Sequence, residues 1–330
     1  MQRLQQLTEW LHQQFPGTSF DLAPASADAS FRRYFRATFQ QRTLIIMDAP
    51  PQHEDCRPFL HVAQLFSAAG VHVPEIVAQN LDLGFLALSD LGSITYLQAL
   101  NPGNARELYG DATEALIAIQ LASRENTLPV YDEALLRREL DLFPEWYVGR
   151  HLQATLDEKQ TSALQTVFQT ILRNNLAQPR VYVHRDYHTR NLMVSTPNPG
   201  ILDFQDAVYG PITYDLASLF KDAYIRWEEA EVLDWLIRYW ELARRAGLPV
   251  GADFADFYRD YEWMGVQRHL KVLGIFARLY HRDGKDGYLK DLPLVMDYLR
   301  RACERYIDLK PLLRLLDQLE SRHPIAGYTF

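Results

Sequence analysis

The sequence predicts an α+β protein in which a β-rich first part with one main helix precedes a larger, mostly helical second part. Runs that alternate apolar and polar residues, typical of strands, dominate residues 19–85. After Gly92 the apolar residues recur at helical spacing instead. The 330 residues also exceed the usual size of a single core. We therefore expect two domains, residues 1–90 and 91–330.

The first part is expected to form an antiparallel sheet preceded by a helix. Leu4, Leu7 and Leu11 have helical spacing. Turn residues then separate four strand candidates, which read FRRYFRATF, TLIIMDA, EIVAQ and FLALSD. One helix interrupts them, because Pro58 suits a helix start and Gly70 suits its end.

The second part is predicted to be helical apart from one short β segment. Apolar faces indicate helices around residues 108–119 and 164–172, and further helices over 232–247 and 295–319. Between them lie three short strand candidates, VYV, LMV and ILDF, the last two joined by a turn at residues 195–200. The sequence thus predicts a strand, a polar loop and a hairpin inside a helical part.

The composition indicates a globular protein that neither spans a membrane nor binds nucleic acid in general. The apolar fraction is 48% and the charged fraction 23%, and no stretch approaches the roughly 18 apolar residues of a membrane span. The net charge of −8 disfavours general nucleic-acid binding. The N-terminal residues lack an apolar signal core, and Cys56 and Cys303 are too far apart for a metal motif. We expect a cytoplasmic monomer with reduced thiols.

The polar residues between the short strands have the spacing of a phosphoryl-transfer loop. His184-Arg185-Asp186, with Asn191 five residues after the Asp, matches the H-R-D-x-x-x-x-N spacing of a kinase catalytic loop. Asp186 can accept the proton of a substrate hydroxyl, and Asn191 can offer an oxygen to Mg²⁺. Asp203 follows in the hairpin as a second metal ligand. The pattern predicts that Asp186, Asn191 and Asp203 converge on one magnesium-bound nucleotide.

The same residues also have a purely structural interpretation. Asp186 and Asp203 could cap turns, and His184 could be a hydrogen-bonded core histidine. Buried carboxylates and amides without partners are costly, whereas Mg²⁺ and a triphosphate repay that cost. The loop and the hairpin in this order therefore favour a kinase, with His184 as a scaffold of the loop.

The whole pattern resembles the aminoglycoside phosphotransferase and choline kinase family, which has the two-lobed fold of protein kinases. Five stretches carry a narrower similarity: SADASFRRYFRAT, LIIMDAPP, LALSDLG, LDFQDAVYGPITYDLASL and QRHLKVLGIFARLYHRDGK. They look like the anomeric kinases of bacterial cell-wall recycling. The resemblance implies ATP and Mg²⁺ as cofactors. It also implies phosphorylation of the 1-hydroxyl of N-acetylmuramate and N-acetylglucosamine in peptidoglycan recycling.

The chain departs from the usual kinase pattern where the phosphates bind. Most kinases pair a strand lysine with a helix glutamate, but this chain has Met47 and Asp48 at the strand position, and residues 59–69 contain no acid. The absence of both the lysine and the glutamate makes physical sense, because a glutamate without its lysine would be a buried charge without a partner. A small-residue turn and the arginines after it are the candidates to meet the phosphates: Ser30, Arg32, Arg33 and Arg36. These arginines could equally form a solvated strand face.

Roles are also expected for residues at the end of the fourth strand and after the hairpin. The run after the fourth strand comes where the family places its adenine-binding hinge, at Leu88, Ser89 and Asp90, although an ordinary linker also fits. Asp206 either supports the metal site or lies in a surface turn. Asp215 has the position of a helix N-cap, and the resemblance implies that it also braces the catalytic loop.

The acceptor site has candidate residues of two chemical kinds. Aromatic and cationic side chains are the candidates to stack on a sugar or meet its carboxylate: Trp146, Tyr147, Arg150, His188 and Arg190. Aromatic residues between helices are more often part of a core. Alternative acceptors are an aminoglycoside, choline or homoserine. Because the strand lysine is missing, a pseudokinase that binds nucleotide without transferring phosphate also stays open.

Overall fold

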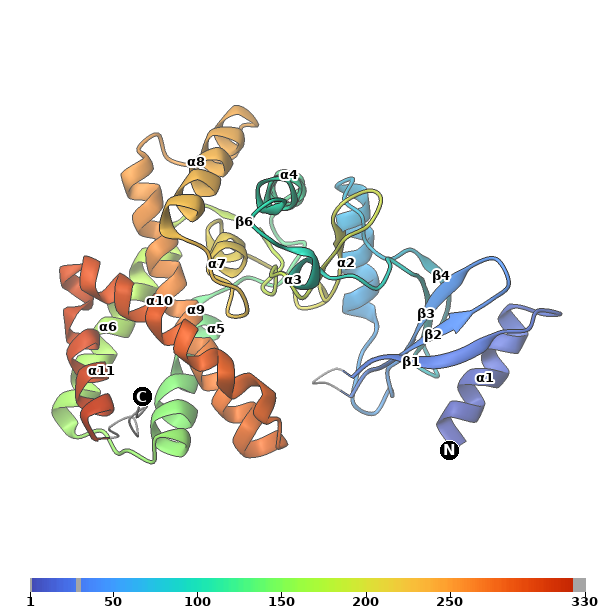
Figure 1. Ribbon diagram of the computed structural model, residues 1–330, viewed down its shortest axis with the longest axis horizontal. Helices are drawn as coiled ribbons and strands as arrows, with labels where there is room; N and C mark the ends of the chain where they lie inside the picture. Colours follow the sequence, from blue (N-terminus) through green and yellow to red (C-terminus); the bar gives the residue numbers. More distant parts are fainter. Residues whose placement is uncertain (1, 28–30, 323–330) are drawn as a thin grey trace. The chain divides into compact units, whose positions relative to one another are not determined.

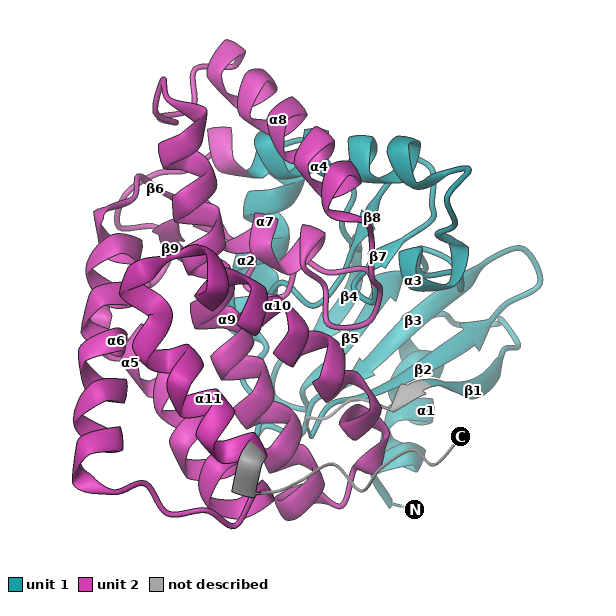
Figure 2. Ribbon diagram, turned by 60° about the vertical axis from the view of Figure 1, so that its left-hand side comes forward, with its two compact units in different colours: residues 1–119, 190–206 teal, residues 120–189, 207–330 magenta. Residues whose placement is uncertain are grey.

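The computed structural model describes residues 2–27 and 31–322, which form two compact units (Figure 2). Unit 1 comprises Met1–Ile119 and Arg190–Asp206, and unit 2 comprises Gln120–Thr189 and Ala207–Phe330. The predicted domain division at residue 90 stays a prediction. The α+β fold class is confirmed, since unit 1 holds a five-stranded sheet and unit 2 is mostly helical.

Unit 1 is built on an antiparallel sheet with the strand order β1-β2-β3-β5-β4. Figure 1 labels β1 to β4 of this sheet, and Figure 2 also labels β5. Its strands are β1 (Asp21–Ala27), β2 (Arg33–Thr38), β3 (Thr43–Asp48), β4 (Ile76–Asn80) and β5 (Phe85–Ser89). Four of them lie where the alternating pattern predicts strands. The sequence did not predict β1, because its residues DLAPASA include a proline and lack alternating large apolar side chains.

One face of this sheet is covered by α1 (Gln2–Gln14). Leu7, Trp10 and Leu11 of the helix are buried with alternate residues of the strands, among them Ala37 and Ile46. Because neighbouring residues of a strand point to opposite faces, this packing assigns the odd-numbered residues of β2 to the α1 side. The sheet thus has one face covered by the N-terminal helix, and the even-numbered residues of β2 lie on the opposite face.

The remaining elements of unit 1 are helices and two short strands. They are α2 (Arg57–Ala68), α3 (Tyr96–Ala99), α4 (Ala105–Leu121), which reaches into unit 2, and the two-residue strands β7 (Leu192–Met193) and β8 (Gly200–Ile201). Pro58 occupies the first turn of α2, and Gly70 follows its last turn with a positive φ, as expected. The β7–β8 pair is the predicted hairpin.

Unit 2 consists mainly of helices. They are α5 (Glu133–Leu142), the π-helix η1 (Phe143–His151), α6 (Glu158–Ala177), α7 (Tyr214–Phe220), α8 (Glu229–Arg245), α9 (Phe254–Asp283), the 3₁₀-helix η2 (Asp286–Asp291), α10 (Leu292–Arg305), the 3₁₀-helix η3 (Ile307–Leu309) and α11 (Lys310–Arg322). The strands β6 (Arg180–Val183) and β9 (Val208–Pro211) form a separate antiparallel pair. The predicted helical stretch 295–319 is divided at η3.

The long helix α9 is the centre of unit 2, and α5, α6, α7, α10 and η1 all pack against it. It is buried on nearly every side between Phe257 and Leu279. Several buried residues of this helix are polar or charged, including Gln267, Arg268, His269 and Lys271. Charged side chains are seldom buried unless they have partners, so this segment marks a polar site inside the helical unit. Among the described residues, no helix is both long enough and apolar enough to cross a membrane.

The turn between β4 and β5 provides a test of the sheet. Gly84 has φ +68°, and a Cβ atom there would lie 1.8 Å from the carbonyl oxygen of Ala49. Gly70 has a similar φ of +83° but open space around it. Gly70→Ala should lower the free energy of unfolding by about 1 kcal/mol, the cost of a left-handed backbone. Gly84→Ala should lower it by about 3 kcal/mol or more, because the backbone must also shift. Equal losses in urea unfolding would contradict this account of the turn.

Candidate active site

The predicted catalytic loop begins where β6 ends in unit 2. Val181, Tyr182 and Val183 are buried in the β6–β9 pair, and the chain then leaves the strand. His184 is fully buried, whereas the side chain of Asp186 is 38% exposed. The strand therefore anchors the loop in the core and leaves the predicted base accessible to a ligand.

Asp215 holds the start of this loop. The backbone N–H groups of His184 and Arg185 donate to its two carboxylate oxygens, at 2.6 and 3.0 Å. The N-cap of α7 is Thr213, so the interpretation of Asp215 as the N-cap is wrong. The helix begins at Tyr214, one residue before the acid, so Asp215 lies in its first turn. These two bonds stabilise an Arg185 backbone whose φ of 78° is unfavourable for a non-glycine residue.

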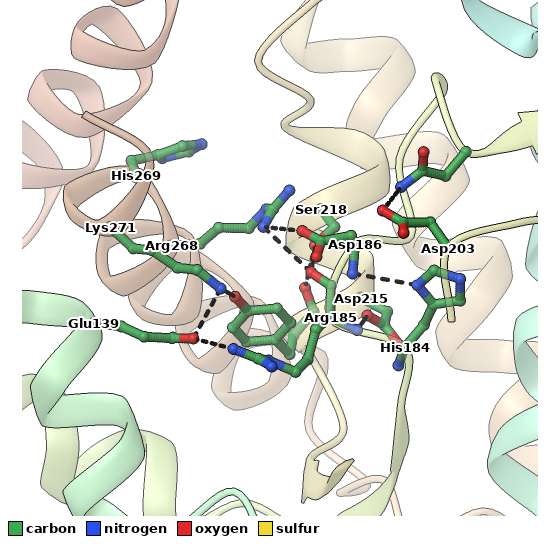
Figure 3. A network of polar contacts seen from close by, with 12 residues as sticks. Glu139, His184, Arg185, Asp186, Asp203, Asp215, Ser218, Arg268, His269 and Lys271 are labelled. Atoms are coloured by element: carbon green, nitrogen blue, oxygen red, sulfur yellow. Dashed lines mark hydrogen bonds and ion pairs between the residues drawn. The ribbon is translucent and has the colours of Figure 1, made fainter. Parts of the chain in front are cut away.

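The buried ring of His184 supports the next residue. The backbone N–H of Asp186 donates to Nδ1 of His184 at 3.2 Å (Figure 3). The imidazole thus contacts the loop backbone from inside the core, as the scaffold interpretation expects.

A buried carboxylate, Glu139 of α5, contacts both Lys271 and Arg185 in the polar cluster next to the loop (Figure 3). Its Oε1 is 2.7 Å from Nη2 of Arg185 and 2.8 Å from Nζ of Lys271. Its Oε2 accepts a hydrogen bond from Gln267 at 3.0 Å and another from the hydroxyl of Tyr131. Burial raises the pKa of Glu139, but Lys271 and Arg185 outweigh it and lower the pKa to about 2. Glu139 is therefore ionised.

Asp186 also faces cations. Nη1 of Arg268 lies 3.8 Å from its Oδ1. Burial would raise the pKa of Asp186, but the surrounding cations hold it well below its ordinary value: Lys271, Arg268, His188 and Arg185. Burial raises the pKa of the neighbouring Asp215 to about 7, although the two backbone N–H groups and Arg268 oppose that shift. Asp186 is thus the carboxylate of this pair that stays ionised, as a proton acceptor must.

The two predicted metal ligands lie together in unit 1. β7 and β8 pair through Leu192 and Ile201, and the next backbone N–H, that of Leu202, donates to the carbonyl of Asn191 at 2.9 Å. This pairing brings Nδ2 of Asn191 to 3.3 Å from Oδ2 of Asp203. Asp203 has a positive φ of 61°. The hairpin therefore places an amide and a carboxylate side by side.

This donor set fits a magnesium ion. Mg²⁺ is commonly bound by one or two carboxylates, with substrate phosphates and water completing its ligands. Asn191 and Asp203 are the residues that would hold it, and Nε2 of Gln205 orients the carboxylate through a 2.8 Å hydrogen bond to Oδ1 of Asp203. In residues 2–27 and 31–322, no group of three or more His, Cys, Asp and Glu side chains could hold a metal ion by itself.

Packing of the next residue fixes this hairpin end to α2. Phe204 is fully buried, and its ring stacks on Phe59 at 4.9 Å and contacts Phe66 at 5.8 Å. Asp206 is exposed, and its supporting role stays a prediction. Asp186 belongs to unit 2 and the Asn191–Asp203 pair to unit 1, so the predicted convergence of all three stays a prediction.

The arginines after the β1–β2 turn each have a carboxylate partner. Nε of Arg32 is 3.1 Å from Glu54, which precedes α2, and both side chains are largely buried. Burial opposes the shift, but Tyr34 and Glu54 raise the pKa of Arg32 above its ordinary value. Arg36 forms a forked pair with Asp90 at 2.7 and 3.1 Å. A freely solvated strand face is therefore excluded for Arg32 and Arg36.

Arg33 points to the other side of the sheet. Its Nε is 3.0 Å from Asp48, which also pairs with Arg3 of α1 at 2.5 Å. Asp48 is completely buried by these contacts. Arg33 thus belongs to the face that α1 covers. Ser30, the other candidate in this turn, lies outside the described residues.

The predicted hinge residues end β5. Leu88 is buried in the sheet, and the backbone N–H of Ser89 donates to the carbonyl of Glu75 at 2.9 Å. Asp90 accepts from Arg36 and from the backbone N–H of Gly92. Adenine binding at these residues stays a prediction.

Four of the five acceptor-site candidates lie on two segments of unit 2. Trp146, Tyr147 and Arg150 belong to η1, where the Tyr147 ring stacks on Phe143 with centroids 5.5 Å apart. His188 follows Asp186 in the loop, and its ring meets that of Tyr224 edge-on at 5.4 Å. Arg190 belongs to unit 1. Sugar contacts by these residues stay predictions.

A protein-family model described as "Phosphotransferase enzyme family" matches residues 21–254, which include the sheet, the catalytic loop and the hairpin. The chain belongs to this phosphotransferase family. Solved structures agree on the fold: the phosphotransferase chain matches the choline kinase LicA from Streptococcus pneumoniae with a TM-score of 0.63 at 12% identity, over 90% of this chain and 98% of that one. Aminoglycoside phosphotransferase APH(2'')-Ib matches with a TM-score of 0.57 at 14% identity, over 89% and 97%.

Relatives of this phosphotransferase with a stated substrate are much more similar in sequence. A protein of Pseudomonas aeruginosa called N-acetylmuramate/N-acetylglucosamine kinase is 53% identical, over 96% of this chain and 97% of the relative. A protein of Neisseria meningitidis with the same name is 51% identical, and the match covers both chains completely. The Caulobacter vibrioides protein of that name is 30% identical over 82% of this chain.

Several residues that support the loop of this phosphotransferase have no predicted role. They are Glu139, Arg268 and Lys271, the last two within the stretch QRHLKVLGIF that carries part of the resemblance. The available signal was charge inside an apolar helical segment. Glu54, which pairs with Arg32, was also missed because it lies before the helix and not within it.

The Glu139 cluster predicts a large loss of stability when its charge is removed. Glu139→Gln should lower the free energy of unfolding by about 3–5 kcal/mol at pH 7, because Lys271 and Arg185 lose a buried countercharge. Urea unfolding measures the difference. Glu133→Gln, an exposed site on the same helix, is the matched control.

The pH dependence of unfolding gives a second readout for Glu139. The pKa of Glu139 is about 2 in the folded protein against an ordinary value of 4.5. The stabilisation that its ionised carboxylate gives to the folded protein is therefore complete above about pH 4.5, and it disappears as the pH falls towards 2. The variant should lack this part of the acid destabilisation. Similar urea midpoints for Glu139→Gln and Glu133→Gln would contradict the prediction.

Proposed function

We propose that the chain is an ATP-dependent kinase that phosphorylates the anomeric 1-hydroxyl of N-acetylmuramate and N-acetylglucosamine in peptidoglycan recycling. The observation that carries this proposal is the 51–53% identity, over essentially the whole chain, to relatives that are named N-acetylmuramate/N-acetylglucosamine kinases. The accessible, ionised Asp186 and the Asn191–Asp203 pair supply the chemistry that such a reaction needs.

In this mechanism Asp186 orients the acceptor hydroxyl and takes its proton as the phosphoryl group is transferred. Magnesium, when bound, supplies charge neutralisation at the nucleotide phosphates, and Asn191 and Asp203 are the side chains that would hold it. The cations that lower the pKa of Asp186 make it a weak base. An anomeric hydroxyl is more acidic than an ordinary alcohol, so it suits a weak base.

The other parts of the proposal concern the acceptor and the state of the protein. A carboxylate such as that of N-acetylmuramate needs a cation, for which Arg150 and His188 are the candidates, and Trp146 or Tyr147 would stack on the ring. We also expect a cytoplasmic monomer, in which the two buried cysteines remain thiols.

Arg32 is the residue that we assign to the nucleotide phosphates in place of the missing strand lysine. Met47, at the lysine position of β3, is buried and uncharged. Arg32 directly follows the β1–β2 turn and pairs with Glu54 before α2, so a cation and a glutamate are joined here as in the usual lysine–glutamate pair. The same helix contacts Phe204, the neighbour of Asp203.

Product analysis with a panel of acceptors tests the main proposal. The purified protein with ATP and Mg²⁺ should phosphorylate N-acetylmuramate and N-acetylglucosamine but not an aminoglycoside, choline or homoserine. The product should resist borohydride reduction, because a phosphate on the anomeric oxygen blocks the aldehyde form.

Asp186→Ala should lower kcat by about 10²–10⁴, whereas Asp283→Ala, at an exposed site paired with its neighbour Arg282, should leave kcat unchanged. Transfer to an aminoglycoside but to neither amino sugar would refute the substrate. Nucleotide binding without transfer to any acceptor would indicate a pseudokinase.

Kinetics with varied ATP test the role of Arg32. Arg32→Gln should raise KM for ATP about tenfold or more, the scale of one lost charge-assisted contact. Arg33→Gln should mainly lower stability, because Arg33 binds the buried Asp48 on the α1 side. Arg42→Gln, in the turn between β2 and β3, is the control and should leave KM for ATP unchanged. A larger KM effect for Arg33→Gln than for Arg32→Gln would assign the phosphates to Arg33.

A further inference from the structure

Arg268 of α9 contacts the catalytic loop at two points (Figure 3). Its Nη1 is 3.8 Å from Oδ1 of Asp186 and 3.4 Å from the carbonyl oxygen of Arg185. The arginine side chain is only 6% exposed, against 38% for Asp186. A single buried guanidinium therefore reaches both the carboxylate of the proposed base and the peptide that precedes it.

The backbone at this point needs support. Arg185 adopts a left-handed φ of 78°, which is unfavourable for a side chain of its size. Its N–H is held by Asp215 of α7, and its carbonyl lies 3.5 Å from the hydroxyl of Ser218 on the same helix. Arg268 adds a contact to that carbonyl from a different helix. The peptide that orients Asp186 is thus held from α7 and from α9.

The contact to the carboxylate differs from an ordinary hydrogen bond. At 3.8 Å, Arg268 attracts the Asp186 oxygen without donating a hydrogen bond to it. Buried charge attraction of this kind favours one orientation of the carboxylate, while solvent and substrate still reach Asp186 through its exposed side. Removal of the guanidinium would leave Asp186 ionised but less constrained.

We propose that Arg268 is a positioning residue for Asp186, holding both its carboxylate and the preceding peptide in the orientation that receives the acceptor hydroxyl. The inference rests on the proposed function in one respect, that Asp186 is the base. Arg268 acts through Asp186 and does not itself bind the acceptor. Its loss therefore affects turnover and leaves acceptor affinity largely intact.

A double-mutant cycle tests this proposal with N-acetylglucosamine as acceptor. Arg268→Met should lower kcat by about 10²-fold, the scale of a misplaced catalytic group, with KM for the acceptor changed by less than about threefold. Arg268→Lys keeps the charge, but one ammonium group can contact only one of the two oxygens, Oδ1 of Asp186 or the carbonyl oxygen of Arg185. The kcat of this variant should therefore lie between those of the wild type and of Arg268→Met. Arg278→Met, a partly buried arginine further along α9, is the matched control and should match the wild type.

The Asp186→Asn background separates positioning from direct binding. If Arg268 acts through Asp186, adding Arg268→Met or Arg268→Lys to Asp186→Asn should change the residual rate by less than about twofold. If Arg268→Met lowers the rate of the Asp186→Asn variant by the same factor as it lowers kcat when Asp186 is intact, the proposal is overturned. That result, or a raised KM for the acceptor, would indicate that Arg268 contacts the substrate directly. Should Arg268→Met fail to fold, the Lys variant carries the same comparison.

A carboxyl titration by NMR needs no turnover, so it separates this inference from the proposed function. The pKa of Asp186 should rise in Arg268→Met, because one of the cations facing it is removed. The titratable and charged groups that remain around it come from three elements: Lys271 of α9, Arg185 and His188 of the loop, and Asp215 of α7. An unchanged pKa would overturn the proposal even if amino-sugar transfer is observed. A raised pKa without amino-sugar transfer would refute the function alone.

Discussion

The buried ion cluster around Glu139 is the interaction on which the catalytic loop depends. One carboxylate forms ion pairs with Lys271 of α9 and with Arg185 of the loop, and it connects both to α5. Burying two cations without it would be strongly unfavourable, so α5, α9 and the loop must be placed together. The bonds from His184 and Arg185 to Asp215 join α7 to the same arrangement. Positions of catalytic atoms therefore follow from charge balance inside the helical unit as much as from apolar packing.

The sequence predicted the sheet well because its strands have local signals. In β2, β3 and β5 large apolar residues fit a half-buried or buried strand, and Pro58 and Gly70 delimit α2. Elements without such signals were missed. β1 contains Pro24 and small residues, and its pairing comes from the neighbouring β2. α9 was not predicted as one helix of 30 residues, because it is buried on nearly all sides and has no distinct polar face.

For the candidate site, spacing alone predicted Asp186, Asn191 and Asp203, since the loop and the hairpin are contiguous in sequence. The hairpin does bring Asn191 and Asp203 together. The supporting residues could not be predicted in the same way. Glu139 and Arg268 lie 46 positions before Arg185 and 83 positions after it, and no local pattern links residues so far apart. Their pairing is a property of helix packing. For Asp215 only the local capping rule was wrong, because the N-cap of α7 is Thr213; the bonds from His184 and Arg185 agree with the support of the loop that the resemblance implied.

The replacement of the strand lysine by Met47 has a consequence for inhibitor chemistry. Compounds that acylate or sulfonylate the phosphate-binding lysine of ordinary kinases need a nucleophilic amine at that strand position. Here the side chain at that position is the thioether of Met47, which is 1% exposed. The next residue, Asp48, forms ion pairs with Arg3 and Arg33. Such reagents would find no amine on this strand, because residues Thr43–Asp48 include no lysine.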